Sequence, residues 1–246
     1  MKSAPPNLSN NQIDKLGERL KAGSPSDDDL RMLSSYRNSF ADAAKAVADT
    51  VREISGLEVT ARSLKTTLSI VAKLKRDGVK QLSSMQDIGG CRVTVENLIG
   101  QDELVEKLMI AFPNAKLYDR VAKPSHGYRA KHLVVKANER RIEIQVRTKL
   151  QHQWALLSEA IADVFGQNLK YGVGEQVALT VLFGSANTFW KFDQLGSLMG
   201  KISFDPVAKD DELILRYDEA YKNMLEEYTI WMELLNDFKR KNDLLH

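Results

Sequence analysis

The sequence contains one cysteine, Cys91, and lacks the features of a secreted or membrane-bound protein. A single cysteine excludes a disulfide bond within the chain and is typical of a reducing compartment. No apolar run approaches the roughly 18 residues that a membrane-spanning helix needs. The N-terminus also lacks the basic and then apolar pattern of a secretory signal. These absences predict a cytoplasmic protein that does not act on a membrane.

The chain has a small net charge, +2 at pH 7, so its overall charge indicates no particular partner. The positions of the basic residues are more informative. One cluster precedes the first predicted strand and another surrounds the last: Lys65, Lys73, Lys75, Arg76 and Lys80, then Arg140, Arg141, Arg147 and Lys149. Such clusters suit polyanionic ligands. A solvated basic surface explains each cluster equally well when it is taken alone.

Helical patterns occupy both ends of the chain. Asn10 is expected to cap a short helix over residues 12–21, and Ser26 precedes the acidic first turn of a longer helix that continues to residue 54. Gly56 should end that helix, and a third helix is predicted over residues 67–76. Beyond residue 149 the helical pattern returns over residues 150–164, 174–198 and 210–241.

Strand patterns occupy the middle of the chain. The segment 88–95 predicts a buried strand, followed by a helix over residues 102–111, and further strands are predicted over residues 131–135 and 141–147. This order predicts an α/β (α+β) fold, in which a small mixed β-sheet is flanked by helices and extended by helices at both ends. The predicted regions are an N-terminal helical region (1–55), a core (56–172) and a C-terminal helical region (173–246).

Residues 141–147 alternate strictly between polar and apolar side chains, so Arg141, Glu143, Gln145 and Arg147 share one face. An edge strand with a solvated face explains this pattern. An active-site floor explains it as well, with Glu143 binding a metal or accepting a proton and the arginines holding phosphate. Asp87, directly before the other strong strand, is then its expected partner, because paired carboxylates commonly hold Mg²⁺ against a nucleoside triphosphate.

Two further segments carry candidate ligand-binding residues. Ser69, Lys73 and Arg76 share one face of the helix over residues 67–76, and Lys65 lies one turn earlier. Such a basic stripe usually faces solvent, but this one stands just upstream of Asp87. In the segment 123–132, the glycine at position 127 allows the backbone to approach a ligand, and Tyr128 is suited to stack on a base.

Four motifs in sequence order resemble the signatures of the RelA/SpoT (alarmone) synthetase family. They are Asp87-Ile-Gly-Gly-Cys-Arg92-Val, Gly127-Tyr128-Arg129-Ala130-Lys131-His132, Glu143-Ile-Gln-Val-Arg147-Thr and Trp154-Ala155. The upstream basic helix matches the ATP-binding helix of that family in residue type and spacing. The resemblance covers roughly residues 59–172. Each motif is weak alone, but four in order form a specific pattern.

The resemblance implies a nucleotidyltransferase-like fold and a small form of the family, with the synthetase core over residues 56–172. It implies that Asp87 and Glu143 are the catalytic and Mg²⁺-binding residues. The expected ATP-binding residues are Arg62, Lys65, Ser69, Lys73 and Arg76. The expected acceptor-binding residues are Arg92, Lys123, Tyr128, His132 and Gln145, with Tyr128 stacking on the acceptor base.

Two positions depart from the family pattern. The family usually has an arginine two residues before the lysine that corresponds to Lys65; Ser63 stands there, and Arg62 is one step further away. It is therefore open whether Arg62 reaches ATP. Members that make alarmones often have Glu-His soon after the Trp-Ala pair, whereas this chain has Ser158-Glu159.

The leading hypothesis is a nucleotide pyrophosphokinase (a GTP diphosphokinase-like transferase) that moves the β,γ-diphosphate of ATP to the ribose 3′-hydroxyl of GDP or GTP and makes a (p)ppGpp-type alarmone. A second hypothesis is a toxin that pyrophosphorylates the 3′-terminal adenosine of tRNA and blocks translation. A third is a non-catalytic module that senses nucleotides or binds a partner. The apolar stripe of the last helix is expected to pack on its own domain, with a second subunit or an antitoxin as the alternative.

Overall fold

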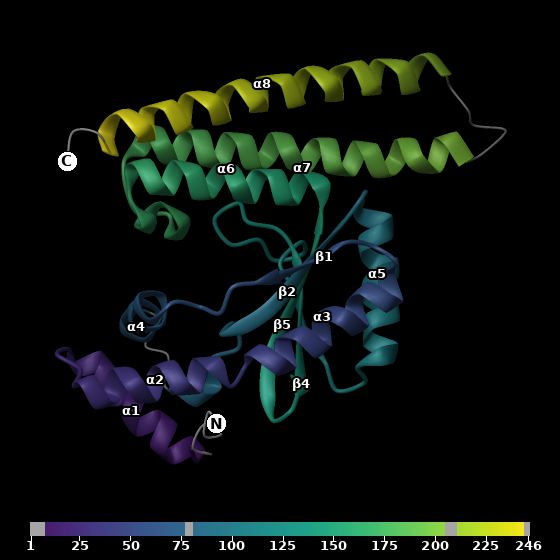
Figure 1. Cartoon of the computed structure of the whole chain (residues 1–246). Helices are drawn as coiled ribbons and strands as arrows, with labels where there is room; N and C mark the ends of the chain where they lie inside the picture. The colour runs from purple at the N-terminus through teal and green to yellow at the C-terminus, as the bar shows by residue number, and fades with distance from the viewer. Residues whose placement is uncertain (1–7, 77–80, 205–210, 244–246) are drawn as a thin grey trace. The chain divides into compact units, whose positions relative to one another are not determined.

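The computed structural model describes residues 8–76, 81–204 and 211–243 (Figure 1). Five strands lie between helices at both ends of the chain. The helices are α1 (Asn10–Ala22), α2 (Asp27–Asn38), α3 (Ala41–Ser55), α4 (Thr67–Arg76), α5 (Leu98–Ala111), α6 (Lys149–Phe165), α7 (Gln176–Phe204) and α8 (Asp211–Asp243), with short 3₁₀ helices η1 (Leu82–Ser84) and η2 (Gln167–Tyr171). The strands are β1 (Val59–Arg62), β2 (Gly89–Val95), β3 (Lys116–Asp119), β4 (Lys131–Ala137) and β5 (Arg140–Thr148).

The chain forms two compact units that interleave along the sequence. The first unit contains the residues up to 93, together with 104–118 and 132–146. The second contains residues 94–103, 119–131 and those from 147 onward. The N-terminal helices and most of the sheet belong to the first unit, and α6, α7 and α8 belong to the second.

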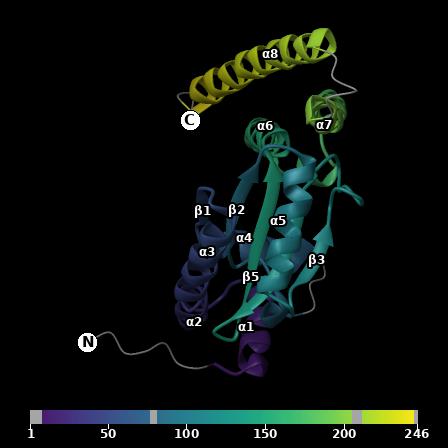
Figure 2. The same cartoon turned by 90° about the vertical axis from the view of Figure 1, so that its right-hand side faces the viewer.

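The strands form one mixed sheet in the order β1-β2-β5-β4-β3, and Figure 2 shows β2 and β5 side by side. The strand β5 is therefore central, and its residues 142–148 are buried on both faces. An edge strand with a solvated face is thus the wrong explanation for its polar residues. The backbones of β2 and β5 approach so closely that a Cβ at Gly90 would collide with the carbonyl oxygen of Glu143.

The long helix expected over residues 26–54 is two helices, α2 and α3, with a break at residues 39–40. The Ser39 hydroxyl donates to the Tyr36 carbonyl at 2.6 Å and so competes with the helical hydrogen bond of that carbonyl. The buried Phe40 ring packs edge-on against the Tyr36 ring at 5.2 Å and holds the break in the core. Periodicity alone did not reveal this break, because apolar residues continue across it.

Capping residues set several helix boundaries. Ser9 rather than the expected Asn10 caps α1, and Gln12 completes a capping box with it. Ser26 caps α2 in the same way with Asp29, as predicted. Gly56 ends α3 in the left-handed conformation, also as predicted. The strands β1 and β3 were not predicted, because four residues are too few to establish a period.

In the second unit, α6, α7 and α8 pack side by side (Figure 1). Their shared core includes Trp154 and Leu157 from α6 and Phe189 from α7, and Tyr221 and Tyr228 from α8 pack against it. This part of the apolar stripe of α8 thus covers its own neighbours, as predicted. The stripe residues Trp231, Leu235 and Phe238 have side chains outside the described part of the structure. Among the described residues, no helix is long and apolar enough to cross a membrane.

Candidate active site

The first unit holds a loop that positions Lys65 beside the start of β2. The Lys65 amide donates to the carbonyl of Ile88 at 2.8 Å. The side chain of Arg37, on α2, fixes the same loop by donating to the carbonyl oxygen of Lys65 at 2.6 Å. The hydroxyl of Thr66 accepts from the amide of Ser69 at 3.2 Å and so caps α4. The loop conformation thus places Lys65 and the first turn of α4 together.

Asp87 lies between the two lysines that the sequence assigned to ATP. Its carboxylate oxygens accept from Lys65 Nζ and from Lys73 Nζ, each at 3.0 Å. Burial raises the pKa of Asp87, but the charges of Lys73 and Lys65 outweigh burial and leave that pKa below its usual value. Asp87 is therefore ionised at neutral pH, and both lysines stand where phosphate oxygens can replace or bridge their bonds to it.

Glu143, 8% exposed on the central strand β5, has three partners. Its carboxylate contacts Arg62 Nη1 at 2.8 Å, His132 Nδ1 at 2.9 Å and Gln145 Nε2 at 2.8 Å. Burial raises the pKa of Glu143, but the hydrogen bond and charge of His132, the charge of Arg62 and the hydrogen bond from Gln145 lower it to about 2. Glu143 is thus a fixed negative charge.

The two carboxylates act on each other electrostatically, since the charge of Glu143 raises the pKa of Asp87. Both remain ionised, and carboxylate oxygens are hard ligands that suit Mg²⁺. Within the described residues, no group of three or more His, Cys, Asp or Glu side chains is arranged to hold a metal. One or two carboxylates are enough to bind Mg²⁺ where substrate phosphates and water supply the other ligands.

Three other residues assigned to ATP or the acceptor lie on α4 and β2. Ser69 and Arg76 are exposed on α4, and the Ser69 hydroxyl accepts from Thr66 at 2.9 Å. Arg92 is half-buried on β2, on the same sheet face as Arg62, because Arg62 pairs with Gly90 and Thr60 with Arg92 in the antiparallel register. Arg62, whose contact with ATP was open, is bound to Glu143 in this structure.

Lys123 and Tyr128 belong to the second unit. Lys123 is exposed. Tyr128 is half-buried, and its hydroxyl accepts from Arg147 Nη2 at 3.0 Å while the Arg147 guanidinium lies 5.2 Å from its ring centre. The Trp154 ring centre is 6.5 Å from the Tyr128 ring. Arg147, which the sequence placed on the polar face of β5, thus orients the tyrosine.

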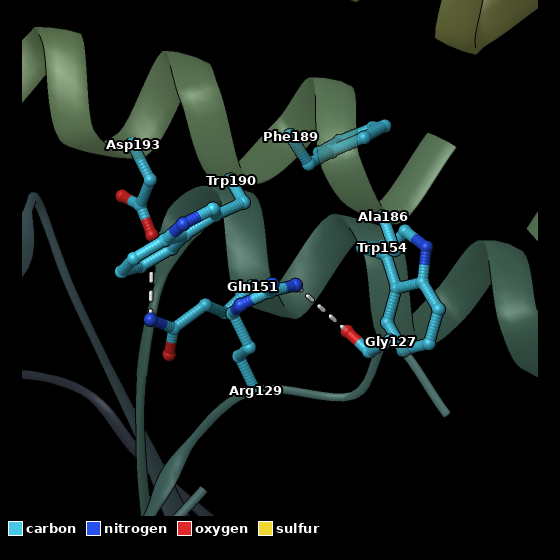
Figure 3. A pocket seen from close by; sticks show the side chains of 8 residues that line it. All are labelled: Gly127, Arg129, Gln151, Trp154, Ala186, Phe189, Trp190 and Asp193. Carbon is cyan, nitrogen blue, oxygen red and sulfur yellow. Dashed lines mark hydrogen bonds between the residues drawn. The ribbon is translucent and has the colours of Figure 1, made fainter. Parts of the chain in front are cut away.

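The loop that carries Tyr128 rests on α6 and α7 (Figure 3). Gly127 has φ +85°, and a Cβ there would lie 2.8 Å from the Cβ of Ala186 and 3.0 Å from the Trp154 ring. Only glycine therefore fits at this position. The Arg129 guanidinium lies 4.8 Å from the Trp190 ring centre and donates to the Gly127 carbonyl at 3.3 Å. These contacts give the loop a defined backbone path.

Sequence reasoning missed a buried carboxylate beside this loop. Asp193, 4% exposed on α7, accepts from Thr148 Oγ1 at 2.7 Å. It also accepts from Gln151 Nε2 at 3.3 Å (Figure 3). Gln151 also exchanges hydrogen bonds with Gln101 at 2.8 and 3.3 Å. Burial raises the pKa of Asp193 to about 6, although these hydrogen bonds and the charge of Arg129 oppose the rise. Nothing in the spacing between Asp193 and the other motifs indicates that Asp193 is buried beside this loop.

Comparison with known proteins identifies the region that holds both carboxylates. Residues 62–162 match the family model described as a region found in RelA/SpoT proteins. Uncharacterised proteins of Mycobacterium tuberculosis and Mycobacterium bovis are each 34% identical over 176 residues, which cover 69% of this chain. The match covers 64% of the length of those relatives.

Solved structures agree with this match at the level of the fold. The small alarmone synthetase 2 from Bacillus subtilis is 24% identical with a TM-score of 0.56, over 69% of this chain and 98% of that one. A GTP pyrophosphokinase family protein from Streptococcus pneumoniae is 21% identical with a TM-score of 0.57, over 75% of this chain and 96% of that one. Residues 62–162 thus carry the region found in RelA/SpoT proteins, and the fold is that of the small alarmone synthetases.

Proposed function

We propose that this protein transfers the β,γ-diphosphate of ATP to the ribose 3′-hydroxyl of GDP or GTP. The observation that carries the proposal is the pair of ionised carboxylates, Asp87 and Glu143, with different partners on each. Lysines surround Asp87, as a triphosphate requires. A histidine and an amide from β4 and β5 adjoin Glu143, as a sugar hydroxyl requires.

In this reaction the 3′-oxygen forms a bond to the β-phosphorus while the bond from that phosphorus to the bridging α,β-oxygen breaks. AMP leaves with that oxygen, and the hydroxyl proton is released. Lys65 and Lys73 would bind the phosphate oxygens and orient the β-phosphorus toward the acceptor. Mg²⁺, when bound by Asp87 and Glu143, would neutralise charge on the transferred group. Because the pKa of Glu143 is about 2, this residue is better suited to binding a cation than to accepting the proton.

The acceptor assignment draws on two further points. His132 and Gln145 are held beside Glu143 by direct hydrogen bonds, so they present fixed polar groups to a ribose. Tyr128, in the second unit, is proposed to stack on the base. The small alarmone synthetase 1 from Bacillus subtilis, 22% identical with a TM-score of 0.52, was solved bound to its product pppGpp, which favours a guanine nucleotide as the acceptor.

The decisive experiment incubates the purified protein with ATP labelled on its terminal phosphates and with either GDP, GTP or bulk tRNA. We expect label in the guanosine nucleotide and release of one AMP for each transfer. Glu143→Gln should remove this transfer, while the control Glu53→Gln, an exposed glutamate on α3, should retain it. Label in tRNA alone would replace the proposal with the toxin hypothesis. No transfer to any acceptor, from a folded protein that binds ATP, would favour a non-catalytic module.

A further inference from the structure

The first unit contains a pocket of about 670 Å³ that is lined by neither of the two carboxylates, Asp87 and Glu143. None of the described residues assigned to ATP, the acceptor or the metal lines it. Its wall comes from the β4–β5 hairpin, the segment around η1 and the beginnings or ends of α1 and α2. A volume in this range is typical of sites for small organic ligands.

The charged side chains that line this pocket are mostly cationic. Four cationic side chains line it, Lys116, Lys136, Arg140 and Arg141, and Glu139 is the one acidic side chain among the described lining residues. Glu139 pairs with Lys136 at 2.7 Å. In the described part of the chain, no acidic side chain pairs with Lys116, Arg140 or Arg141. Cationic side chains outnumber acidic ones four to one among the described lining residues, and this excess favours an anionic ligand.

Two of these cations are held in place before any ligand arrives. The Arg140 guanidinium lies 5.4 Å from the ring centres of both Tyr36 and Phe40, two buried aromatic residues. Arg141 donates to the Ser83 carbonyl at 3.1 Å. Ser83 is itself fixed by Asp14, whose carboxylate accepts from the Ser83 amide at 2.9 Å and hydroxyl at 3.0 Å. Preorganised guanidinium groups bind phosphates well because little side-chain entropy is lost.

We propose that this pocket binds a small phosphate-bearing anion with two or three linked phosphates, such as a nucleoside diphosphate or inorganic pyrophosphate. Guanidinium groups match phosphate oxygens in geometry. The side chains of Ser83, Ser84 and Gln86 also line the pocket, and their polar groups donate within the protein, to Asp14, the Gln81 carbonyl and Tyr118. The pocket is a concavity rather than a stripe along the surface, which favours a compact anion over a nucleic-acid backbone.

The pocket is linked to the candidate active site through the backbone. Gln86, which lines the pocket, directly precedes Asp87, and Arg141 lies two residues before Glu143 on the same face of β5. The site is proposed on its own geometry and does not depend on the transfer reaction.

Hydrogen–deuterium exchange of the full chain with inorganic pyrophosphate tests the proposal, because it separates the two sites by sequence. Binding in the pocket should protect residues 83–86 and 134–141, and binding at the candidate active site should protect residues 65–73. In the double variant Lys116→Gln/Arg141→Gln, at least ten times more pyrophosphate should be needed to protect residues 83–86 and 134–141. Protection of residues 65–73 should remain as in the unmodified protein.

Two further variants control for folding and for general charge. Glu139→Gln removes the opposing charge and should strengthen binding in the pocket, which a damaged fold cannot do. Arg31→Gln/Lys45→Gln removes two exposed charges from α2 and α3 and should change nothing. ADP in place of pyrophosphate should protect the same segments. Absence of protection there, at concentrations that protect residues 65–73, would overturn the proposal, and so would protection by single-stranded RNA but by neither small anion.

Discussion

Glu143 and Asp193, one in each unit, are buried to similar degrees, 8% and 4% exposed, yet their pKa values move in opposite directions. Burial raises both. For Glu143, a histidine, an arginine and an amide reverse the effect and lower the pKa to about 2. Asp193 accepts from a hydroxyl and an amide, and no cation pairs with it directly among the described residues, so its pKa rises to about 6. The charge of the partners, rather than burial, distinguishes the two sites.

The carboxylates of the two units are suited to different roles. The compensated carboxylates of the first unit stay ionised and are suited to hold a cation, and the lysines beside Asp87 are suited to phosphates. Asp193 sits in a neutral hydrogen-bond network that joins α6 and α7 beside the loop of Tyr128. A carboxylate in such a network can bind a proton near pH 6, so its charge depends on pH.

The largest effect is expected when a negative charge is removed from the first unit. Asp87→Asn and Glu143→Gln change little volume but each removes one of the paired charges. We expect each to cost several kcal/mol of transition-state stabilisation, on the order of a thousandfold or more in transfer rate. Labelled-ATP assays at saturating Mg²⁺, with circular dichroism as a control for folding, measure this. Near-normal turnover in either variant would remove that residue from the site.

The second prediction concerns stability and pH in the second unit. Because the folded-state pKa of Asp193 lies above the ordinary 3.8, its contribution to stability is complete below pH 3.8 and is lost as pH rises through about 6. The shift of about two pKa units corresponds to about 3 kcal/mol. Asp193→Asn should therefore gain stability relative to the unmodified protein at pH 8 and match it more closely at pH 5.

Urea unfolding at the two pH values measures this difference. The groups that face Asp193 are Arg129 from the loop and Tyr217 and Tyr221 from α8, and none of them titrates between pH 5 and 8. Glu143 behaves oppositely: its contribution is present above pH 4.5 and is lost as pH falls toward 2. The exposed residue Asp218 on α8 gives a matched control, since Asp218→Asn should show the same pH dependence as the unmodified protein. A D193N variant with an unchanged pH dependence would contradict the raised pKa.

Much of the first unit could be predicted from sequence, and the reasons are local. The alternation in β5 placed Glu143 and Gln145 on one face, and the helical spacing of α4 placed Lys73 near Lys65. The second unit was harder. Asp193 contacts Thr148 across 45 positions, so no periodicity links the two. In the first unit the same is true of Arg37, which reaches the Lys65 loop across 28 positions. Patterns show which residues share a face, but not which distant element covers that face.

The third prediction tests whether Tyr128 contributes to acceptor binding. Tyr128→Ala should weaken acceptor use by about 1–3 kcal/mol, as for one stacked base, with the KM for ATP unchanged. Tyr128→Phe keeps the ring but loses the hydrogen bond from Arg147, and should cost only about 1 kcal/mol. Steady-state kinetics with each substrate varied separates the two effects. A rise in the KM for ATP alone would show that the tyrosine serves the other substrate.

The smallest effect is expected from changing Arg129, whose charge acts on Asp193. The Arg129 charge is the weakest of the influences that lower the pKa of Asp193, and it acts without a direct ion pair in the described structure. Arg129→Gln should therefore move the pH at which stability is lost upward, by less than the changes above. Arg129→Lys retains the charge but loses the planar group that stacks on Trp190, so it should leave this pH nearly unchanged while lowering stability at every pH. Unfolding midpoints measured from pH 5 to 8 distinguish the two variants. If both variants shift the pH equally, the stacking geometry rather than the charge of Arg129 controls Asp193, and the contrast between the two buried carboxylates would rest on packing instead of on the charge of their neighbours.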